Sequence, residues 1–117
     1  MDQIREDRCG EMKNRIYHIT TEAEAKRAHL GGEYTPQAFD SEGFIHCSYV
    51  HQIPGVMERV FKGKTGLVVF EIDPAQLSCK VVDENLEGGT ELFPHIYGPL
   101  PMSAVVRWDP VKVYHSP

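Results

Sequence analysis

Three histidines carry the strongest chemical signal in this chain of 117 residues. His18, His46 and His95 each lie inside an apolar segment. Histidine is the side chain whose charge changes closest to neutral pH, and it is the commonest group in general acid–base catalysis. Imidazoles placed together on an apolar surface could therefore move protons or bind an anion.

Each of these histidines has a hydroxyl-bearing neighbour two residues further on. The pairs are His18 with Thr20, His46 with Ser48, and His95 with Tyr97. Because side chains alternate between the two faces of a strand, both members of each pair face the same side. Three such stripes on one sheet predict a cleft with apolar walls and a few convergent polar groups, the usual composition of a small-molecule site. Glu84 follows another apolar segment and could point into this cleft.

Other interpretations of the same residues stay open at this point. A histidine in an apolar strand can be a core residue with its hydrogen bonds satisfied. A zinc site is not expected, because no two of the three histidines have the spacing of a ligand pair and there is no His-Glu-x-x-His motif. On a strand Cys47 would face away from His46, which disfavours a Cys–His nucleophile and favours a core position for Cys47.

The elements that position these residues follow from hydrophobic periodicity. We expect strands at 15–20, 43–48, 67–72, 79–82, 104–108 and 111–114, and helices at 21–30 and 51–61. Residues 33–43 are predicted to form a loop, and 93–97 an edge segment because of Pro94. Thr21 and Glu24 form a potential capping box, and Gly31-Gly32 a helix stop. The sequence thus predicts an α+β fold with about two helices and a small, split, mixed but mainly antiparallel sheet.

Composition and charge exclude several classes of protein. The chain has 12 Lys+Arg against 17 Asp+Glu, a formal net charge of -5, which argues against sequence-independent binding of nucleic acid. No apolar run approaches the ~20 residues of a membrane span, and the first residues are too charged for a signal peptide. Three widely spaced cysteines without a Cys-x-x-Cys motif favour reduced thiols and a cytoplasmic location. Residues 1–13 are expected to form a flexible arm and 14–117 a single domain.

Two blocks of the sequence resemble a known family. The first block comprises Ile16-Tyr17-His18-Ile19-Thr20, Gly32-Glu33-Tyr34 and Glu42-Gly43-Phe44-Ile45-His46-Cys47-Ser48, followed by Gln52. The second block comprises Leu67-Val68-Val69, Ile72-Asp73, Glu84, Leu92-Phe93-Pro94-His95-Ile96-Tyr97-Gly98-Pro99-Leu100 and Ala104-Val105. On these blocks the chain is identified as a member of the domain of unknown function 952 family.

That resemblance implies a fold similar to the ADP-ribosyltransferase superfamily, in which a split mixed sheet grips NAD in a central cleft. In that superfamily a histidine on the first strand commonly bonds a ribose hydroxyl of NAD, and His18 with Thr20 matches this position. An aromatic residue stacks on nicotinamide, a role for which Tyr34 or Tyr97 is available. A late acidic residue steers the acceptor, and Glu84 is the acid that matches it.

Two functional hypotheses follow. As an enzyme, the domain would bind NAD or a related nucleotide and perform glycosyl or phosphoryl transfer; as a binding module, it would recognise a small nucleotide-like or anionic metabolite without turnover. The candidate catalytic residues are His46, His95 and Glu84, and the candidate ligand-binding residues are His18, Thr20, Tyr34, Ser48 and Tyr97. In a third interpretation the histidines only tie strands together, and function lies in a partner of unknown kind. The sequence specifies no metal and no oligomeric state.

Overall fold

Short strands and helices alternate along residues 15–85 and 89–111, the parts of the chain that the computed structural model describes. The elements are β1 (Ile16–Thr21), α2 (Glu22–Gly31), β2 (Glu33–Tyr34), α3 (Phe39–Glu42), β3 (Ile45–His46), η1 (Val50–Gln52), α4 (Ile53–Arg59), β4 (Leu67–Ile72), η2 (Pro74–Gln76), β5 (Lys80–Glu84), β6 (Phe93–Tyr97), β7 (Leu100–Pro101), η3 (Met102–Ala104) and β8 (Val105–Pro110). The α+β class expected from the sequence is confirmed. The arm expected at 1–13, and nearly all of the strand expected at 111–114, lie outside the described residues.

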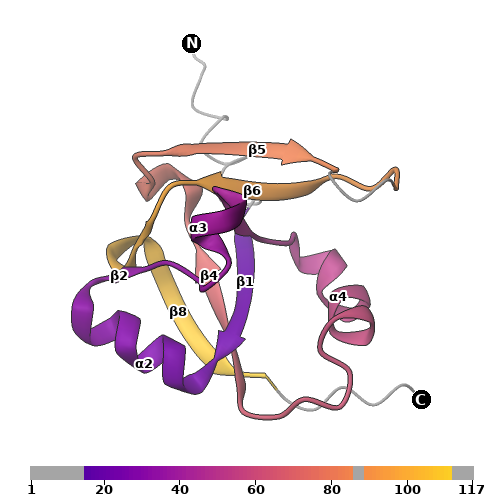
Figure 1. Ribbon diagram of the computed structural model, residues 1–117, viewed down its shortest axis with the longest axis horizontal. Helices are drawn as coiled ribbons and strands as arrows, with labels where there is room; N and C mark the ends of the chain where they lie inside the picture. The colour runs from indigo at the N-terminus through magenta and orange to yellow at the C-terminus, as the bar shows by residue number, and fades with distance from the viewer. Residues whose placement is uncertain (1–14, 86–88, 112–117) are drawn as a thin grey trace.

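The strands form three small sheets, with orders β1-β4-β8, β2-β7 and β3-β6-β5. Every strand pair in the described part of the chain is antiparallel, so the expectation of a mixed sheet was wrong. Figure 1 shows β5 and β6 running across one end of β1 and β4, so the two larger sheets cross instead of continuing each other. This crossing brings β1 next to β3, where Tyr17 and Ser48 exchange backbone hydrogen bonds of 2.8 Å.

The apolar run at 67–72 forms the central strand of its sheet, as expected. β4 pairs with β1 over its whole length and with β8 on its other side. Four of its six side chains are buried, which explains the nearly continuous apolar sequence.

The first helix begins and ends as its sequence predicts. Thr21 is the N-cap residue and accepts a hydrogen bond of 3.2 Å from the backbone N–H of Glu24. Gly32 ends the helix in the left-handed region, with φ 85°. The Glu24 carboxylate pairs with Arg27 instead of reaching back to Thr21, so only half of the expected capping box forms.

Three further expectations about local structure need correction. Residues 33–43 contain β2 and α3 and are not only a loop, because Glu33 and Tyr34 pair with β7. The strand expected at 43–48 is reduced to the two residues of β3, and the helix expected at 51–61 starts as the 3-10 helix η1 and ends at Arg59.

None of the helices in the described ranges is long and apolar enough to cross a membrane.

Pro94 lies in a central strand, whereas the sequence predicted an edge. β6 pairs with β3 on one side and with β5 on the other. The Pro94 carbonyl accepts a hydrogen bond of 3.0 Å from Cys47 N–H, just past the end of β3. The proline nitrogen faces this same side, where β3 has already ended, so its missing N–H costs the ladder little.

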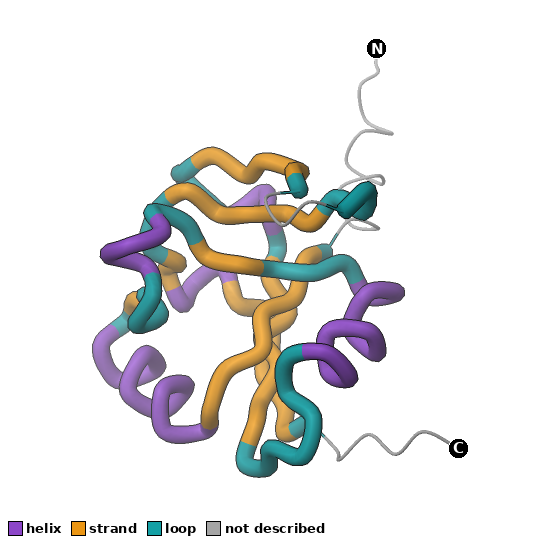
Figure 2. Tube along the Cα trace, turned by 45° about the vertical axis from the view of Figure 1, so that its right-hand side comes forward, coloured by secondary structure: helices purple, strands orange, loops and turns teal. Residues whose placement is uncertain are grey.

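Two apolar clusters lie on opposite faces of β1. The larger contains Ile16 and Phe70 together with Ala25 and Ala28 of α2. The smaller contains Ile19 and Leu67 with Met57 of α4, in a cluster that also takes in partly buried side chains of that helix. Both views of the chain show α2 and α4 on opposite sides of β1 (Figure 2), and the cavity described below lies on the α4 side.

Phe70 is the largest fully buried side chain, and its ring contacts the rings of Tyr34 and Trp108 edge-on. Phe70→Ala should lower the free energy of unfolding by about 3–5 kcal/mol, because it leaves a cavity at the centre of the larger cluster. Urea denaturation measures this change. Leu30→Ala, at a side chain that is 87% exposed, is the control and should change stability by no more than about 0.5 kcal/mol. Equal effects of the two substitutions would contradict this account of the core.

Candidate functional site

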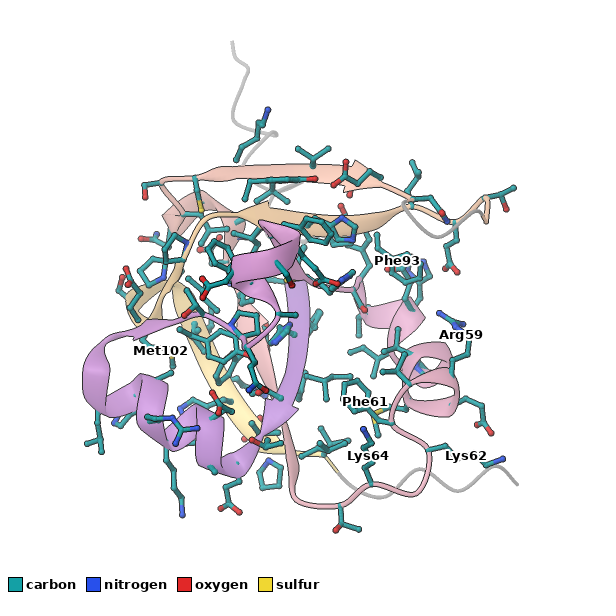
Figure 3. The ribbon with its side chains drawn as sticks, in the orientation of Figure 1. Arg59, Phe61, Lys62, Lys64, Phe93 and Met102 are labelled. Carbon is teal, nitrogen blue, oxygen red and sulfur yellow. The ribbon has the colours of Figure 1, made fainter. Side chains whose placement is uncertain are left out.

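A cavity of about 310 Å³ opens between β1, α4 and the β3-β6-β5 sheet. Its apolar wall consists of Ile19, Val56, Val60, Phe61 and Phe93. Its polar lining includes His46, Ser48, Arg59, Glu84 and His95. Figure 3 shows Arg59 on α4 beneath Phe93 of β6, with Phe61 further down towards β1. The volume is at the lower end of the range for small-molecule sites.

His95 and Glu84 form a hydrogen-bonded pair in this cavity. Glu84 on β5 lies two register positions from His95 on β6, because it pairs with Phe93 while His95 pairs with Val82. The Nδ1 of His95 lies 2.9 Å from Glu84 Oε2. The hydroxyl of Tyr97 donates a hydrogen bond to the same oxygen, and this bond, followed by that from His95, lowers the pKa of Glu84. An ionised Glu84 therefore fixes the proton of His95 on Nδ1 and leaves Nε2 as the acceptor.

His46 lies directly beside this pair. His46 and His95 are register partners on β3 and β6, and their ring centroids are 4.9 Å apart at nearly a right angle. Phe44 stacks on the His95 ring with centroids 4.4 Å apart, which restricts the ring to one orientation. The Nε2 of His46 lies 3.1 Å from Glu42 Oε1, so the second imidazole also has a carboxylate partner.

His18 is held by two hydrogen bonds in the interior. Its Nδ1 donates to the carbonyl oxygen of His46 at 2.5 Å, and its Nε2 lies 2.8 Å from the hydroxyl of Tyr34. Burial lowers the pKa of His18 to about 4, so the ring is neutral at pH 7. The neutral ring with its proton on Nδ1 accepts a hydrogen bond from Tyr34 at Nε2. The Tyr34 hydroxyl also lies 3.1 Å from Thr20 Oγ1, and burial raises the pKa of Tyr34 to about 12.

The structure therefore brings His18, His46 and His95 together, but in two different roles. His46 and His95 keep one ring nitrogen each without a partner among the described residues. His18 lines the cavity too, yet both of its ring nitrogens are occupied. Thr20 and Tyr34 are buried behind it and are not part of the cavity lining.

Ser48 and Tyr97 are the predicted ligand-binding residues still to be placed, and only one of them lines the cavity. Ser48 lines the cavity, and its backbone is fixed by Tyr17. Tyr97 does not line the cavity; it contacts Glu84 from the outside and is 37% exposed. Phe93 is half-buried in the cavity wall because it shares a face of β6 with His95.

Cys47 is in the core, as expected from the alternation of the strand. It belongs to the larger apolar cluster, and burial raises the pKa of its thiol well above the usual range. A thiol held in its neutral form is a poor nucleophile. Within 15–85 and 89–111 no group of three or more His, Cys, Asp or Glu side chains is arranged to hold a metal ion.

Arg59 is the residue that sequence reasoning missed. It lies three positions after Val56 and beside Val60, so the helix places all three side chains along the cavity. That spacing was visible in the sequence, but the expected helix was assigned only by its apolar residues. Arg59 has no ion pair with any residue in the described ranges.

Comparison with known proteins places this chain in a family. The model of the family described as "Protein of unknown function (DUF952)" matches residues 19–108. The chain belongs to this family. This agrees with the resemblance noted in the sequence, while no link to ADP-ribosyltransferases is shown. No curated protein matches the chain.

Two solved structures of a bacterial protein support the fold. The crystal structure of protein CC0527 from Caulobacter crescentus is 30% identical and covers 84% of this chain and 86% of that chain, with a TM-score of 0.75. The solution NMR structure of CC0527 is 30% identical and covers 84% of each chain, with a TM-score of 0.73. These matches establish the family and the DUF952 fold, and they assign no ligand and no reaction.

Acid should destabilise the protein through His18. The ordinary pKa of 6.5 applies in the unfolded chain, and burial lowers it to about 4 in the folded one. Between these values the unfolded chain binds a proton that the folded chain does not, so the free energy of unfolding falls as the pH falls through this window. The loss amounts to at most about 3 kcal/mol.

Urea unfolding near pH 7 and near pH 4.5 measures this loss. His18→Gln removes the titrating group but keeps a donor and an acceptor, so the variant should lose less stability in acid than the wild-type protein. An identical loss in both proteins would show that His18 is not the responsible group.

Proposed function

We propose that this DUF952 domain binds a small organic anion in the cavity between α4 and β6. The observation that carries this proposal is the position of Arg59. Arg59 is an exposed residue of α4 that lines a cavity with an otherwise largely apolar wall, and it forms no ion pair among the described residues. Guanidinium groups bind carboxylates and phosphates through paired hydrogen bonds, which makes Arg59 a suitable anchor for such a ligand.

The other groups in the cavity fit the same kind of ligand. His95 offers Nε2, and His46 offers Nδ1 beside it. Phe61 and Phe93 provide an apolar surface for the uncharged part of the ligand. A ligand with a single anionic group and a compact apolar or aromatic body would satisfy both halves of this lining.

Nucleotides belong to this class, and NAD is the first of them to test because of the resemblance to the ADP-ribosyltransferase superfamily. A ribose held by His18 and Thr20 would require a free nitrogen on His18, and both are bonded to protein groups. We therefore assign the ligand contacts to Arg59, His95 and His46.

Arg59→Gln should weaken binding of the anion by about 10- to 100-fold, because a hydrogen bond to a charged group contributes about 1.5–3 kcal/mol. The ligands to be compared are inorganic phosphate, AMP, ADP-ribose and NAD, by calorimetric titration and by the rise in melting temperature that binding produces. The control is Lys62→Gln, which removes a positive charge from the loop after α4; Figure 3 shows Lys62 pointing away from the cavity.

The control should bind like the wild-type protein. The proposal is wrong if none of these anions binds to the wild-type protein, or if the two substitutions weaken binding equally. Equal weakening would mean that only general electrostatic attraction is at work.

A further inference from the structure

Two histidine–carboxylate pairs lie side by side, and both imidazoles and Glu84 line the cavity. His95 is paired with Glu84 at 2.9 Å, and His46 with Glu42 at 3.1 Å. The two carboxylates belong to different elements, Glu84 to β5 and Glu42 to α3. The two imidazoles belong to residues that pair directly between β3 and β6. Each imidazole keeps one ring nitrogen that bonds no described residue. Two adjacent imidazoles in a cavity that an arginine also lines suit proton transfer at both ends of a reacting phosphate.

We propose that His95 and His46 act as a general base and a general acid that hydrolyse a small phosphodiester anchored by Arg59. This inference rests on the proposed anion site and adds a reaction and a substrate class to it. The evidence for it is the paired geometry of the two imidazoles, which anion binding alone does not require.

His95 is assigned as the base. Its ring is buried, with 3% exposure, and is fixed by Phe44 on one face and by Glu84 at Nδ1. A proton held on Nδ1 leaves the lone pair of Nε2 available to a water molecule. A fixed ring matters because a base acts only within hydrogen-bonding reach of the proton that it takes.

His46 is assigned as the acid. Its side chain is 46% exposed, so it can exchange protons directly with solvent between turnovers. Glu42 accepts a hydrogen bond from Nε2–H of the protonated ring, which leaves the N–H at Nδ1 to serve the substrate.

The reaction needs only water as co-reactant. His95 takes one proton from water as the water oxygen forms a bond to phosphorus. The bond between phosphorus and the leaving oxygen breaks, and His46 donates its proton to that oxygen. The products are a phosphomonoester and an alcohol, and proton exchange with solvent restores both rings. Arg59 stabilises the negative charge on the non-bridging oxygens.

The charge and the lining favour a diester over a monoester. A phosphodiester carries one negative charge, which matches the one guanidinium of Arg59, a residue without an ion pair among residues 15–85 and 89–111, whereas a phosphomonoester carries about -1.5 to -2 at pH 7. The apolar walls, with Phe61 and Phe93, suit a nucleoside or another compact aromatic substituent.

Other ionisable groups surround the two imidazoles. They are Glu42 from α3, His18 from β1, Glu84 from β5, Tyr97 from β6 and Arg59 from α4. Hydrolysis of a diester with a poor leaving oxygen needs an unprotonated base and a protonated acid at the same time, so its rate should show a bell-shaped dependence on pH.

Two substrates separate the roles of the histidines. Adenosine 2′,3′-cyclic phosphate has a poor leaving oxygen that needs the acid, and methyl 4-nitrophenyl phosphate has a good one that does not. His95→Gln and His95→Asn should each reduce kcat/KM by about 10²- to 10⁴-fold on both substrates, the usual contribution of a general base. His46→Asn should reduce it by a similar factor on the cyclic phosphate alone. His29→Asn, on α2 and outside the cavity, is the matched control and should leave both rates unchanged.

Glu84 is a positioning residue in this scheme, since it acts through His95. Glu84→Gln should lower kcat with little change in KM and should shift the ascending limb of the pH profile. Asp83→Asn, one residue away and bonded to Tyr49, should leave kcat, KM and the profile as they are. If Glu84 had only a structural role, Glu84→Gln would lower the fraction of folded protein without shifting the pH profile.

The outcomes separate this inference from the proposed function. If the wild-type protein binds neither the cyclic phosphate nor any of inorganic phosphate, AMP, ADP-ribose and NAD, both are overturned. If it binds the cyclic phosphate without hydrolysing it, or if both folded His95 variants keep the wild-type rate, the acid–base pair is overturned and the anion site stands. If His46→Asn slows both substrates equally, the assignment of His46 as the acid is overturned.

Discussion

One half-buried imidazole joins the three sheets that the described residues form. His18 belongs to β1, its Nδ1 donates to the backbone of β3, and its Nε2 accepts from Tyr34 on β2. These two bonds require a neutral ring with one specific tautomer, and burial enforces the neutral state. β2 and β3 contain only two residues each, so their own ladders are too short to fix their position. The side-chain bonds of His18 supply the missing constraint.

The cavity depends on this constraint through β3. The bond to the His46 carbonyl fixes the backbone that carries the His46 side chain, and the pairing of β3 with β6 then brings His95 alongside. β5 adds Glu84 from the far side of β6. Residues from β3, β5, β6 and α4 thus meet beside the face of β1 that α4 covers, and His18 of β1 also lines this cavity. Both ring nitrogens of His18 are bonded to protein groups, so its role there is structural.

Sequence reasoning reached the local features of this arrangement. The alternation of side chains placed His46 and Ser48 on one side and Cys47 on the other, and the apolar run at 67–72 identified the central strand. It could not separate His18 from His46 and His95, because all three have the same local pattern. What distinguishes them is whether a long-range partner occupies the second ring nitrogen: Tyr34 reaches Nε2 of His18, whereas the cavity lies next to His95.

The other incorrect predictions also concern features that depend on contacts between residues distant in the sequence. Pro94 was assigned to an edge because proline lacks an N–H, and only the early end of β3 makes a central position tolerable. Arg59 was overlooked because a charged residue on an amphipathic helix is usually solvated. Its relation to β6 arises from the crossing of the two sheets, which no local pattern records. The three-sheet arrangement was missed because two-residue strands carry no period of their own.

The position of β5 has a consequence for the behaviour of the protein in concentrated solution. β5 is the edge strand of its sheet in the described residues, and an unpaired edge can recruit a strand from another molecule. It carries Lys80, Asp83 and Glu84, and charged side chains on an edge oppose such pairing. Glu84 therefore belongs to the candidate site and to the protection of the sheet edge at the same time. Replacing this one carboxylate would therefore change the lining of the cavity and remove a charge from the exposed edge at the same time.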